Sequence, residues 1–474
     1  MPILHRMAVF ALFASWLLIP VSALQAQTTD TRTEEIQELR HQLAAINERL
    51  TRLENEDSAA KTENAAPGED AAALSAAGAS LHAATPQTPQ AEQTITASDR
   101  NALDILKGTT VNMLLDGYYA YNFNYPIGRA NLLRAYDVSS NSFSLNQADL
   151  VLEHAPDPAN GKRFGARIDL QFGQATEALQ GNQVNEPRPE IYRNIFQAYG
   201  TYVAPIGSGL SIDFGKWASS LGIEGNYTKD QMNYSRSYWF NYLPFYHAGV
   251  RLNYAFTPWL SGRYWVVNGT QQTEAFNNFK DELFGVELKP HKSIDWIVNY
   301  YLGQEHPDFQ YVTNGSPSLP EQQGLPFEPI VNPPKGKLHI FDSYVTWAAT
   351  PKWTFALEGD YVISRDQTYS APAHTDGGAV YARYQFNPLL ALSGRTEYLS
   401  DRGGLFSGKV QALKEFTLTF DQAVGNGFLV REELRHDFSN QPYFLTDTLG
   451  NLSNDQTTAT IGMVWWFGGK QGAW

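Results

Sequence analysis

Segments in which apolar and polar residues alternate recur along most of the chain. In the last one, residues 457–467 (TTATIGMVWWF), Ala459 and Met463 fall on one face, and Thr458 and Thr460 fall on the other. A period of two is typical of a β-strand with one apolar face. A tilted strand of about 9–11 residues crosses a bilayer, and only a closed ring of strands leaves no unpaired backbone groups in lipid. The pattern therefore predicts an all-β fold, a transmembrane antiparallel up-and-down β-barrel.

The connections between these segments alternate in length. Short turns are predicted at residues 155–162, 205–209, 257–258, 290–292, 350–352, 387–388 and 425–427. Longer polar loops are predicted at residues 122–142, 173–190, 218–246, 268–280, 303–336, 364–376, 401–412 and 437–456. Short turns on one side and long loops on the other are typical of outer-membrane barrels. Seven turns and eight loops join sixteen strands, with counts of 14 and 18 as alternatives, and place both barrel ends on the short-turn side.

Composition fits a barrel and argues against several other classes of protein. The mean hydropathy of −0.36 is too low for a helical membrane protein, whereas the polar lumen of a barrel would dilute its apolar outside. The net charge of −14 makes nucleic acid an unsuitable partner. The chain has no cysteine, so it has neither disulfides nor thiolate metal ligands. Its ten histidines show no metal-ligand spacing, and we predict no catalytic residue, metal or cofactor.

The first hundred residues predict four short segments ahead of the barrel. Residues 1–26 read as a secretory signal peptide, with an uncleaved membrane anchor as the alternative. Residues 27–56 carry Ile and Leu at heptad spacing and predict a coiled-coil helix, or else one amphipathic helix packed on its own domain. Residues 57–97, rich in Ala, Pro, Thr and Gln, predict a disordered linker. A short helix is predicted at 98–108, and the barrel at 109–474.

Two strings at the ends of the barrel region resemble a known family. Residues 115–124 (LDGYYAYNFN), with the preceding 106–110 (LKGTT), and residues 464–470 (VWWFGGK) are similar to the OmpL-like putative β-barrel porins (family 2) of Gram-negative bacteria. Because both barrel ends are placed on the short-turn side, we expect the N-terminal helix in the periplasm. The resemblance implies a pore in the Gram-negative outer membrane. It implies outer-membrane lipid, ions and small hydrophilic solutes as partners, but names no solute. We also expect a homotrimer, joined through the barrel and the coiled coil.

The inward-facing register predicts which charged residues line the pore. A water-filled channel selects solutes by the charges at its narrowest part. The pore-lining candidates are Arg163, Arg167, Asp169, Arg251, Arg263, Glu358, Asp360, Arg383, Arg395, Glu397, Arg431, Glu433 and Arg435. Among them Arg383, Arg395, Arg431 and Arg435 are expected to form a basic wall. The structural alternative is that such charges pair across strands and only hold the interior together.

The third long loop, residues 218–246, corresponds in order to the loop that folds inward in general porins. Its constriction candidates are Glu224, Lys229, Asp230 and Arg236, and it also carries the aromatic run Tyr238-Trp239-Phe240. We therefore expect passive diffusion of ions and small hydrophilic solutes. The first alternative is a barrel-anchored envelope-tethering or adhesion protein, and the second is a barrel enzyme whose catalytic residues come from separate strands.

Overall fold

The computed structural model describes residues 107–179, 186, 188–311, 327–425, 427–470 and 473–474. The predicted signal peptide (1–26), coiled-coil helix (27–56) and linker (57–97) lie outside these residues, as does most of the short helix predicted at 98–108. Nothing in the described residues tests those four predictions. Among the described residues, no helix has the length and apolar character needed to cross a membrane.

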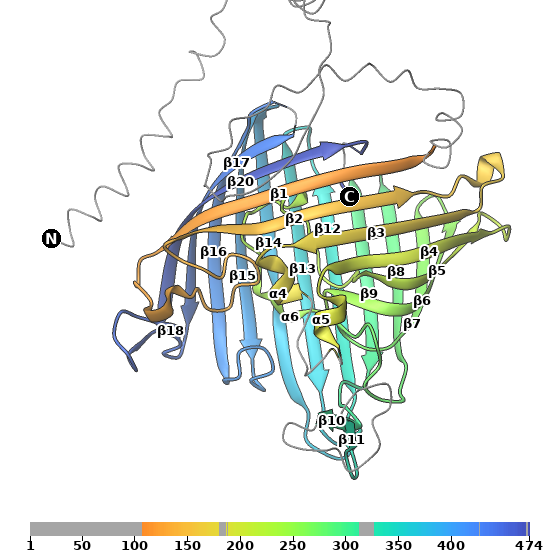
Figure 1. The fold of residues 1–474 in the computed structure, drawn as a ribbon. Coiled ribbons are helices and arrows are strands. Elements are labelled where there is room, and N and C mark those ends of the chain that lie inside the picture. Colours follow the sequence, from red (N-terminus) through yellow and green to blue (C-terminus); the bar gives the residue numbers. More distant parts are fainter. Residues whose placement is uncertain (1–106, 180–185, 187, 312–326, 426, 471–472) are drawn as a thin grey trace, which may run out of the picture. The chain divides into compact units, whose positions relative to one another are not determined.

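Sixteen antiparallel strands form a closed barrel, in which each strand pairs with its neighbours in the chain and β1 pairs with β20 to complete the ring (Figure 1). The strands are β1 (Thr109–Asn122), β2 (Ser142–His154), β3 (Phe164–Phe172), β4 (Ile195–Ala204), β5 (Leu210–Ala218), β6 (Tyr246–Thr257), β7 (Leu260–Val267), β8 (Asp281–His291), β9 (Ile294–Gly303), β12 (Leu338–Ala348), β13 (Trp353–Ser364), β14 (Ala373–Asn387), β15 (Leu390–Asp401), β16 (Gln411–Ala423), β17 (Phe428–Ser439) and β20 (Asp455–Gly468). The predicted fold class and the count of sixteen strands are confirmed.

The alternation of the sequence is visible in the exposure of side chains. In β20, Thr458 and Thr460 are each only 1% exposed, whereas Met463 and Trp465 are 37% and 40% exposed. Phe164 and Phe214, on other strands, are each 72% exposed. Large apolar side chains therefore cover the outside of the barrel, as lipid requires, and polar side chains face the lumen.

The strands are joined by short turns at one end of the barrel and by long loops at the other, as predicted. Several long loops contain short elements. These are η3 (Ile127–Arg129) in the first loop, α4 (Ala175–Leu179) and α5 (Pro189–Tyr192) in the second, η5 (Thr228–Asp230) and α6 (Tyr238–Tyr242) in the third, the hairpin β10 (Phe309–Tyr311) with β11 (Phe327–Pro329) in the fifth, and the pair β18 (Phe444–Leu445) with β19 (Leu452–Ser453) in the eighth. One turn holds η4 (Pro158–Asn160).

Candidate functional site

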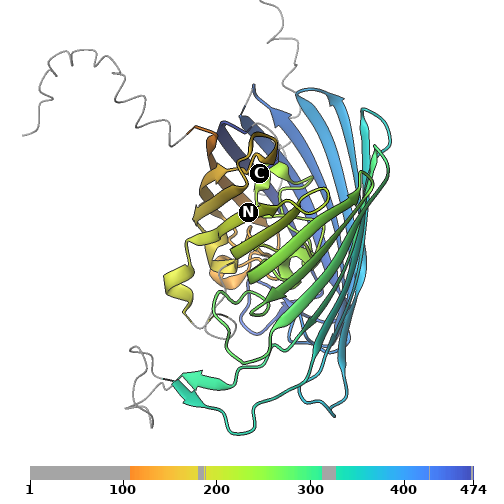
Figure 2. The same ribbon diagram turned by 90° about the vertical axis from the view of Figure 1, so that its right-hand side faces the viewer.

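The third long loop, residues 219–245 between β5 and β6, folds into the lumen instead of extending from the barrel (Figure 2). Thr228, Asn233 and Ser235 in its middle have no exposed surface. The loop contacts β1 and β3 on one side and β12, β13, β15 and β17 on the other, through the side-chain hydrogen bonds described below. It therefore crosses the inside of the barrel, where a constriction is expected to lie.

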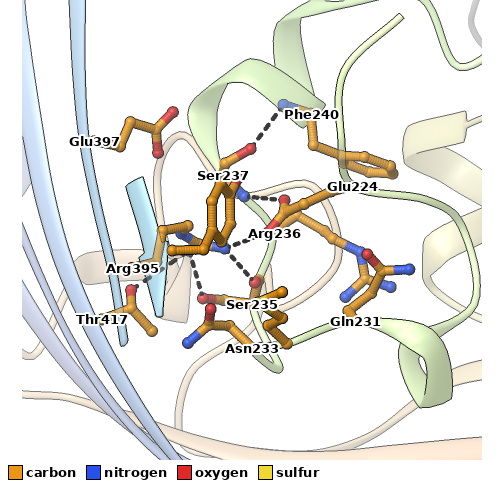
Figure 3. A network of polar contacts seen from close by, with 12 residues as sticks. Glu224, Gln231, Asn233, Ser235, Arg236, Ser237, Phe240, Arg395, Glu397 and Thr417 are labelled. Carbon is orange, nitrogen blue, oxygen red and sulfur yellow. Dashed lines mark hydrogen bonds and ion pairs between the residues drawn. The ribbon is translucent and has the colours of Figure 1, made fainter. Parts of the chain in front are cut away.

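Arg395 of β15 joins the wall to the loop at the loop's centre (Figure 3). Its Nη1 donates to the carboxylate of Glu224 at 2.6 Å and to the carbonyl oxygen of Ser235 at 2.8 Å. Its Nε donates to Glu415 of β16 at 2.7 Å. Hydrogen bonds of a guanidinium to carboxylates are roughly twice as strong as neutral ones. Arg395 thus holds one loop carboxylate and one loop backbone carbonyl at once.

Arg431 of β17 holds the part of the loop around η5. Its Nη1 donates to the carbonyl oxygens of Thr228 at 2.8 Å and Asn233 at 3.1 Å, and its Nη2 donates to that of Gln231. Its Nε is paired with Asp421 of β16 at 2.8 Å. Because one rigid guanidinium fork binds three backbone carbonyls, it fixes the path of the chain and not merely the position of one side chain.

Arg435, two residues further along β17, repeats this arrangement. Its Nη1 donates to the carbonyl oxygen of Arg236, and its Nε donates to Asp437 at 2.8 Å. Asp437 in turn accepts from Arg134, which lies in the first long loop and also pairs with Asp137 at 2.7 Å. The first loop is therefore tied into the same network of charges.

Carboxylates of the wall accept hydrogen bonds from the loop backbone. Glu433 accepts from the N–H groups of Tyr234 at 2.7 Å and Ser235 at 3.0 Å. Glu397 accepts from the N–H groups of Tyr238 and Trp239, each at 2.9 Å, at the start of α6. Ser237 caps α6 by accepting from the N–H of Phe240 at 2.9 Å. These contacts satisfy N–H groups that the beginning of a helix leaves without partners.

A glycine in the last strand makes room for a loop aromatic ring. A methyl group added at Gly462 would lie only 2.3 Å from Cε2 of Tyr234. The hydroxyl of Tyr234 donates to Asp116 of β1 at 2.9 Å, and Asp116 also accepts from the hydroxyl of Thr228 at 2.8 Å. The ring is thus packed against β20 and held by β1, the two strands that close the barrel.

The four predicted constriction residues play different structural parts. Arg236 folds back on its own loop, with donors to the carbonyl oxygens of Gly225, Tyr234 and Asn226 at 2.8–3.0 Å. Glu224 pairs with Arg395, as described above. Lys229 pairs with Asp230 at 2.6 Å and lies 4.5 Å from the ring centre of Trp474. Burial lowers the pKa of Lys229, and the hydrogen bond to Asp230 offsets part of that effect.

An apolar layer lies beside this polar network. Trp239 of α6 and Leu243 pack with Trp265 of β7, Leu399 of β15 and Leu413 of β16 in one buried cluster. Burial raises the pKa of the Tyr238 phenol in the same cluster, and the charge of Asp437 adds to the effect. The loop is therefore packed against the wall through a charged side and an apolar side.

Among the remaining predicted pore-lining residues, Glu358 also accepts from the loop backbone, at the N–H of Ile223 (3.0 Å), whereas the arginines bond to the wall. Arg167 pairs with Asp169 at 2.8 Å, and Arg251 with Asp213 at 2.7 Å. Asp169 reaches the loop by accepting from the hydroxyl of Tyr227. Three arginines are partly exposed to water or bond only to the wall: Arg163, which donates to Val203, Arg263, which lies 3.8 Å from Glu287, and Arg383, which pairs with Asp421 at 2.6 Å. The structure thus brings three members of the expected basic wall, Arg395, Arg431 and Arg435, onto the loop, and leaves Arg383 apart.

Several residues of the site are absent from the sequence prediction. Asp342 of β12, Asp437 of β17 and Arg134 of the first loop are all buried in the network. Asp342 follows the alternation of its strand, so the period-two pattern was sufficient to find it. Arg134 and Tyr234 lie in loops, where the sequence has no period that indicates which side chains turn inward.

The comparisons with known proteins agree with the fold. The model of the family described as putative beta-barrel porin-2, OmpL-like, matches residues 108–467. Similar solved structures include an anion-selective porin from Comamonas acidovorans (TM-score 0.51, 8% identity, covering 76% of this chain and 99% of that one). They also include OprB of Pseudomonas putida (TM-score 0.47, 11% identity, covering 78% of this chain and 96% of that one). A third is the outer-membrane channel DcaP of Acinetobacter baumannii (TM-score 0.47, 10% identity, covering 76% of this chain and 97% of that one). At these identities the likeness concerns the fold alone. No curated protein matches the chain.

Proposed function

Because the chain belongs to the OmpL-like β-barrel porin family, we propose that it is an outer-membrane channel for passive diffusion of ions and small hydrophilic solutes. The resemblance predicted from the two end strings is confirmed by that family match. The family also favours a channel over a barrel enzyme. The passage of solutes and the ion preference are part of this proposal. The pore-lining and constriction roles of the residues predicted from the sequence are also part of it.

The third loop is the observation that carries this proposal. A loop that crosses the lumen sets the width and charge of any path beside it. Here the loop is held by wall arginines and carboxylates, and it buries Arg395, Arg431 and Arg435 almost completely. We therefore expect a narrow path and a small single-channel conductance.

Near the short turns, we expect partly exposed charged side chains to line the rest of the channel. The carboxylate of Glu153 lies 3.4 Å from the ammonium of Lys470, and Lys289 pairs with both Glu287 and Asp295. The side chain of Arg383 is 25% exposed. Because both signs of charge occur together there, we expect only a weak preference between anions and cations at this end.

Recordings from planar lipid bilayers test the proposal. Purified full-length protein should give discrete conductance steps that are blocked neither by protease inhibitors nor by lipase inhibitors. A protein without the barrel region, residues 27–97 expressed alone, is the control for contaminating channels. Persistent absence of steps from correctly folded, heat-modifiable protein would contradict the proposal.

The N-terminal segment and the trimer remain predictions. We propose that the coiled coil (27–56) and linker (57–97) lie in the periplasm, and that three barrels associate. Cross-linking of the full chain and of a variant lacking residues 27–97 tests both points. Trimers from both proteins would assign assembly to the barrel. If the variant lacking residues 27–97 keeps its conductance but loses its attachment to the envelope, the protein has a tethering role in addition to the channel role.

A further inference from the structure

Three buried carboxylates lie together where the beginning of the third loop meets strands β12 and β13. Asp342 of β12, and Glu358 and Asp360 of β13, are 2%, 3% and 5% exposed. Each offers a carboxylate oxygen, and these three oxygens all lie within 4.8 Å of one another. Asp342 and Asp360 are direct partners in the antiparallel register of the two strands. Like charges in directly opposed positions destabilise a strand pair, so this arrangement requires compensation.

The hydrogen bonds at the cluster leave one carboxylate, that of Asp360, without a donor. Asp342 accepts from the N–H of Gly222 at 3.1 Å and from the amide of Asn299 at 2.7 Å. Glu358 accepts from the N–H of Ile223 at 3.0 Å and from the hydroxyl of Tyr381 at 3.2 Å. Both oxygens of Asp360 are buried, and neither accepts a hydrogen bond from an N–H or O–H donor of the described residues; the carboxyl of Asp342 is the acidic group beside them.

No arginine or lysine in the described part of the chain forms an ion pair with these three residues; Arg263, whose charge acts on Asp342 from a distance, pairs with Glu287. Burying an ionised carboxylate without a counter-charge costs several kcal/mol or more. The cluster is thus distinct from the neighbouring carboxylates Glu397, Glu415 and Asp421, since each of those lies within the arginine network.

We propose that Asp342, Glu358 and Asp360 bind one hard divalent cation of the Ca²⁺ type, which fastens the beginning of the third loop to the barrel wall. Hard cations prefer oxygen ligands, and all three residues supply oxygen. Ca²⁺–O distances are about 2.3–2.6 Å, so two oxygens on opposite sides of the ion lie about 5 Å apart. Three carboxylate oxygens that all lie within 4.8 Å of one another fit that requirement. Asp360 provides the oxygens that the protein itself leaves unused.

The same carboxylates hold the loop backbone from the other side. Gly222 has a left-handed backbone conformation, with a φ of 81°, which glycine adopts without strain. This conformation directs its N–H toward Asp342, and a methyl group at Gly222 would lie 3.2 Å from Oε1 of Glu358. Asp342 and Glu358 would therefore bind the cation and also accept from the N–H groups of Gly222 and Ile223. The cation would neutralise the negative charge that these two residues face.

Terbium luminescence tests the site, with Tb³⁺ as the probe and Ca²⁺ as the competitor. Protein refolded in detergent without lipopolysaccharide and stripped with EDTA is titrated with Tb³⁺, which the adjacent Tyr381 can sensitise. The variant Asp360→Asn removes the carboxylate charge with the same shape. Asp149→Asn is the matched control, because Asp149 of β2 is also buried with both oxygens unpartnered but does not belong to the three-carboxylate group.

We expect Tb³⁺ emission that Ca²⁺ displaces in the wild type and in Asp149→Asn, and an affinity at least about tenfold lower in Asp360→Asn. Ca²⁺ should also raise the thermal unfolding temperature of the wild type. Absence of Ca²⁺-displaceable emission from the wild type, or an equal loss in Asp149→Asn, would overturn the proposal. Stabilisation by acid with no response to Ca²⁺ would also overturn it, because the cluster would then be neutralised by protons.

Two further points keep this test decisive. If Asp360→Asn does not fold, Glu358→Gln replaces it, and the calcium dependence of wild-type unfolding is decisive without any variant. The site goes beyond the proposed channel function and does not rest on it. Luminescence and unfolding are measured without a membrane potential, so an absent cation leaves the conductance proposal intact, and an absent conductance leaves the cation site intact.

Discussion

The guanidinium of Arg395 and the carboxylate of Glu224 form a buried ion pair, 2.6 Å long, that joins strand β15 to the third loop. Removing one partner of a buried pair leaves an unpaired charge and costs about 3–5 kcal/mol. We predict that Arg395→Gln and Glu224→Gln each destabilise the barrel, and that the double variant recovers part of the loss. A double-mutant cycle in urea should give a coupling energy of about 1–3 kcal/mol.

The exposed pair Arg402–Asp376 is the control for that cycle, since its side chains are 54% and 36% exposed. Exposed pairs typically contribute about 0.2–1 kcal/mol. Equal coupling energies for the two pairs would show that the Arg395 contact does not fasten the loop.

Arg431 is predicted to control the conductance. Arg431→Gln removes the donors to the carbonyl oxygens of Thr228, Gln231 and Asn233, so the middle of the loop should leave its position. We expect larger and noisier conductance steps in planar bilayers. Arg163→Gln removes the same charge from a residue that donates to Val203 of the wall and not to the loop, so its steps should be no noisier than those of the wild type. Steps of unchanged size in Arg431→Gln would count against the loop as the constriction.

Gly462 is predicted to be a position where a single methyl group disturbs the loop. In Gly462→Ala the new methyl would meet the ring of Tyr234 at 2.3 Å, and overpacking of this kind typically costs about 1–3 kcal/mol. We expect a lower unfolding temperature, which is measured as the temperature at which the protein changes its migration in gels. Gly394→Ala is the control, because its nearest contact would be 3.8 Å away; a similar loss in both variants would point to strand propensity instead.

Arg383 is predicted to affect ion preference. Its partly exposed side chain pairs with Asp421, which keeps Arg431 as a second partner when Arg383 is removed. Arg383→Ala should therefore shift the reversal potential in a salt gradient toward cations without unfolding the network. Arg402→Ala removes an equal charge at the long-loop end and should shift it less. A reversal potential identical to that of the wild type would make Arg383 a structural residue only.

The period-two alternation was sufficient to predict the barrel, the alternating connections and the inward-facing charges, because register and lipid together decide which face of each strand is apolar. It also placed Arg395, Arg431 and Glu433 on the lumen side. It did not predict that these groups bind the backbone of the third loop, because a loop carbonyl oxygen has no signature in the sequence.

The carboxylate cluster shows a second limit. Glu358 and Asp360 were predicted to face the lumen, but their neighbour Asp342 comes from another strand, and only the pairing register brings it opposite Asp360. Spacing along one strand cannot give that register. For the same reason, a search for metal-ligand spacing within the sequence found no candidate.

Accessibility of a single cysteine tests the placement of the loop most directly. The chain has no cysteine, so Ser235→Cys introduces a unique thiol at a position with no exposed surface, and Tyr369→Cys introduces one at a loop position that is 89% exposed. Both variants are treated with a water-soluble maleimide in folded form. We predict rapid labelling at residue 369, and protection at residue 235 that is lost when Arg431→Gln is added. Equally rapid labelling at both positions without that added substitution would contradict a third loop held inside the barrel by the charges of its wall.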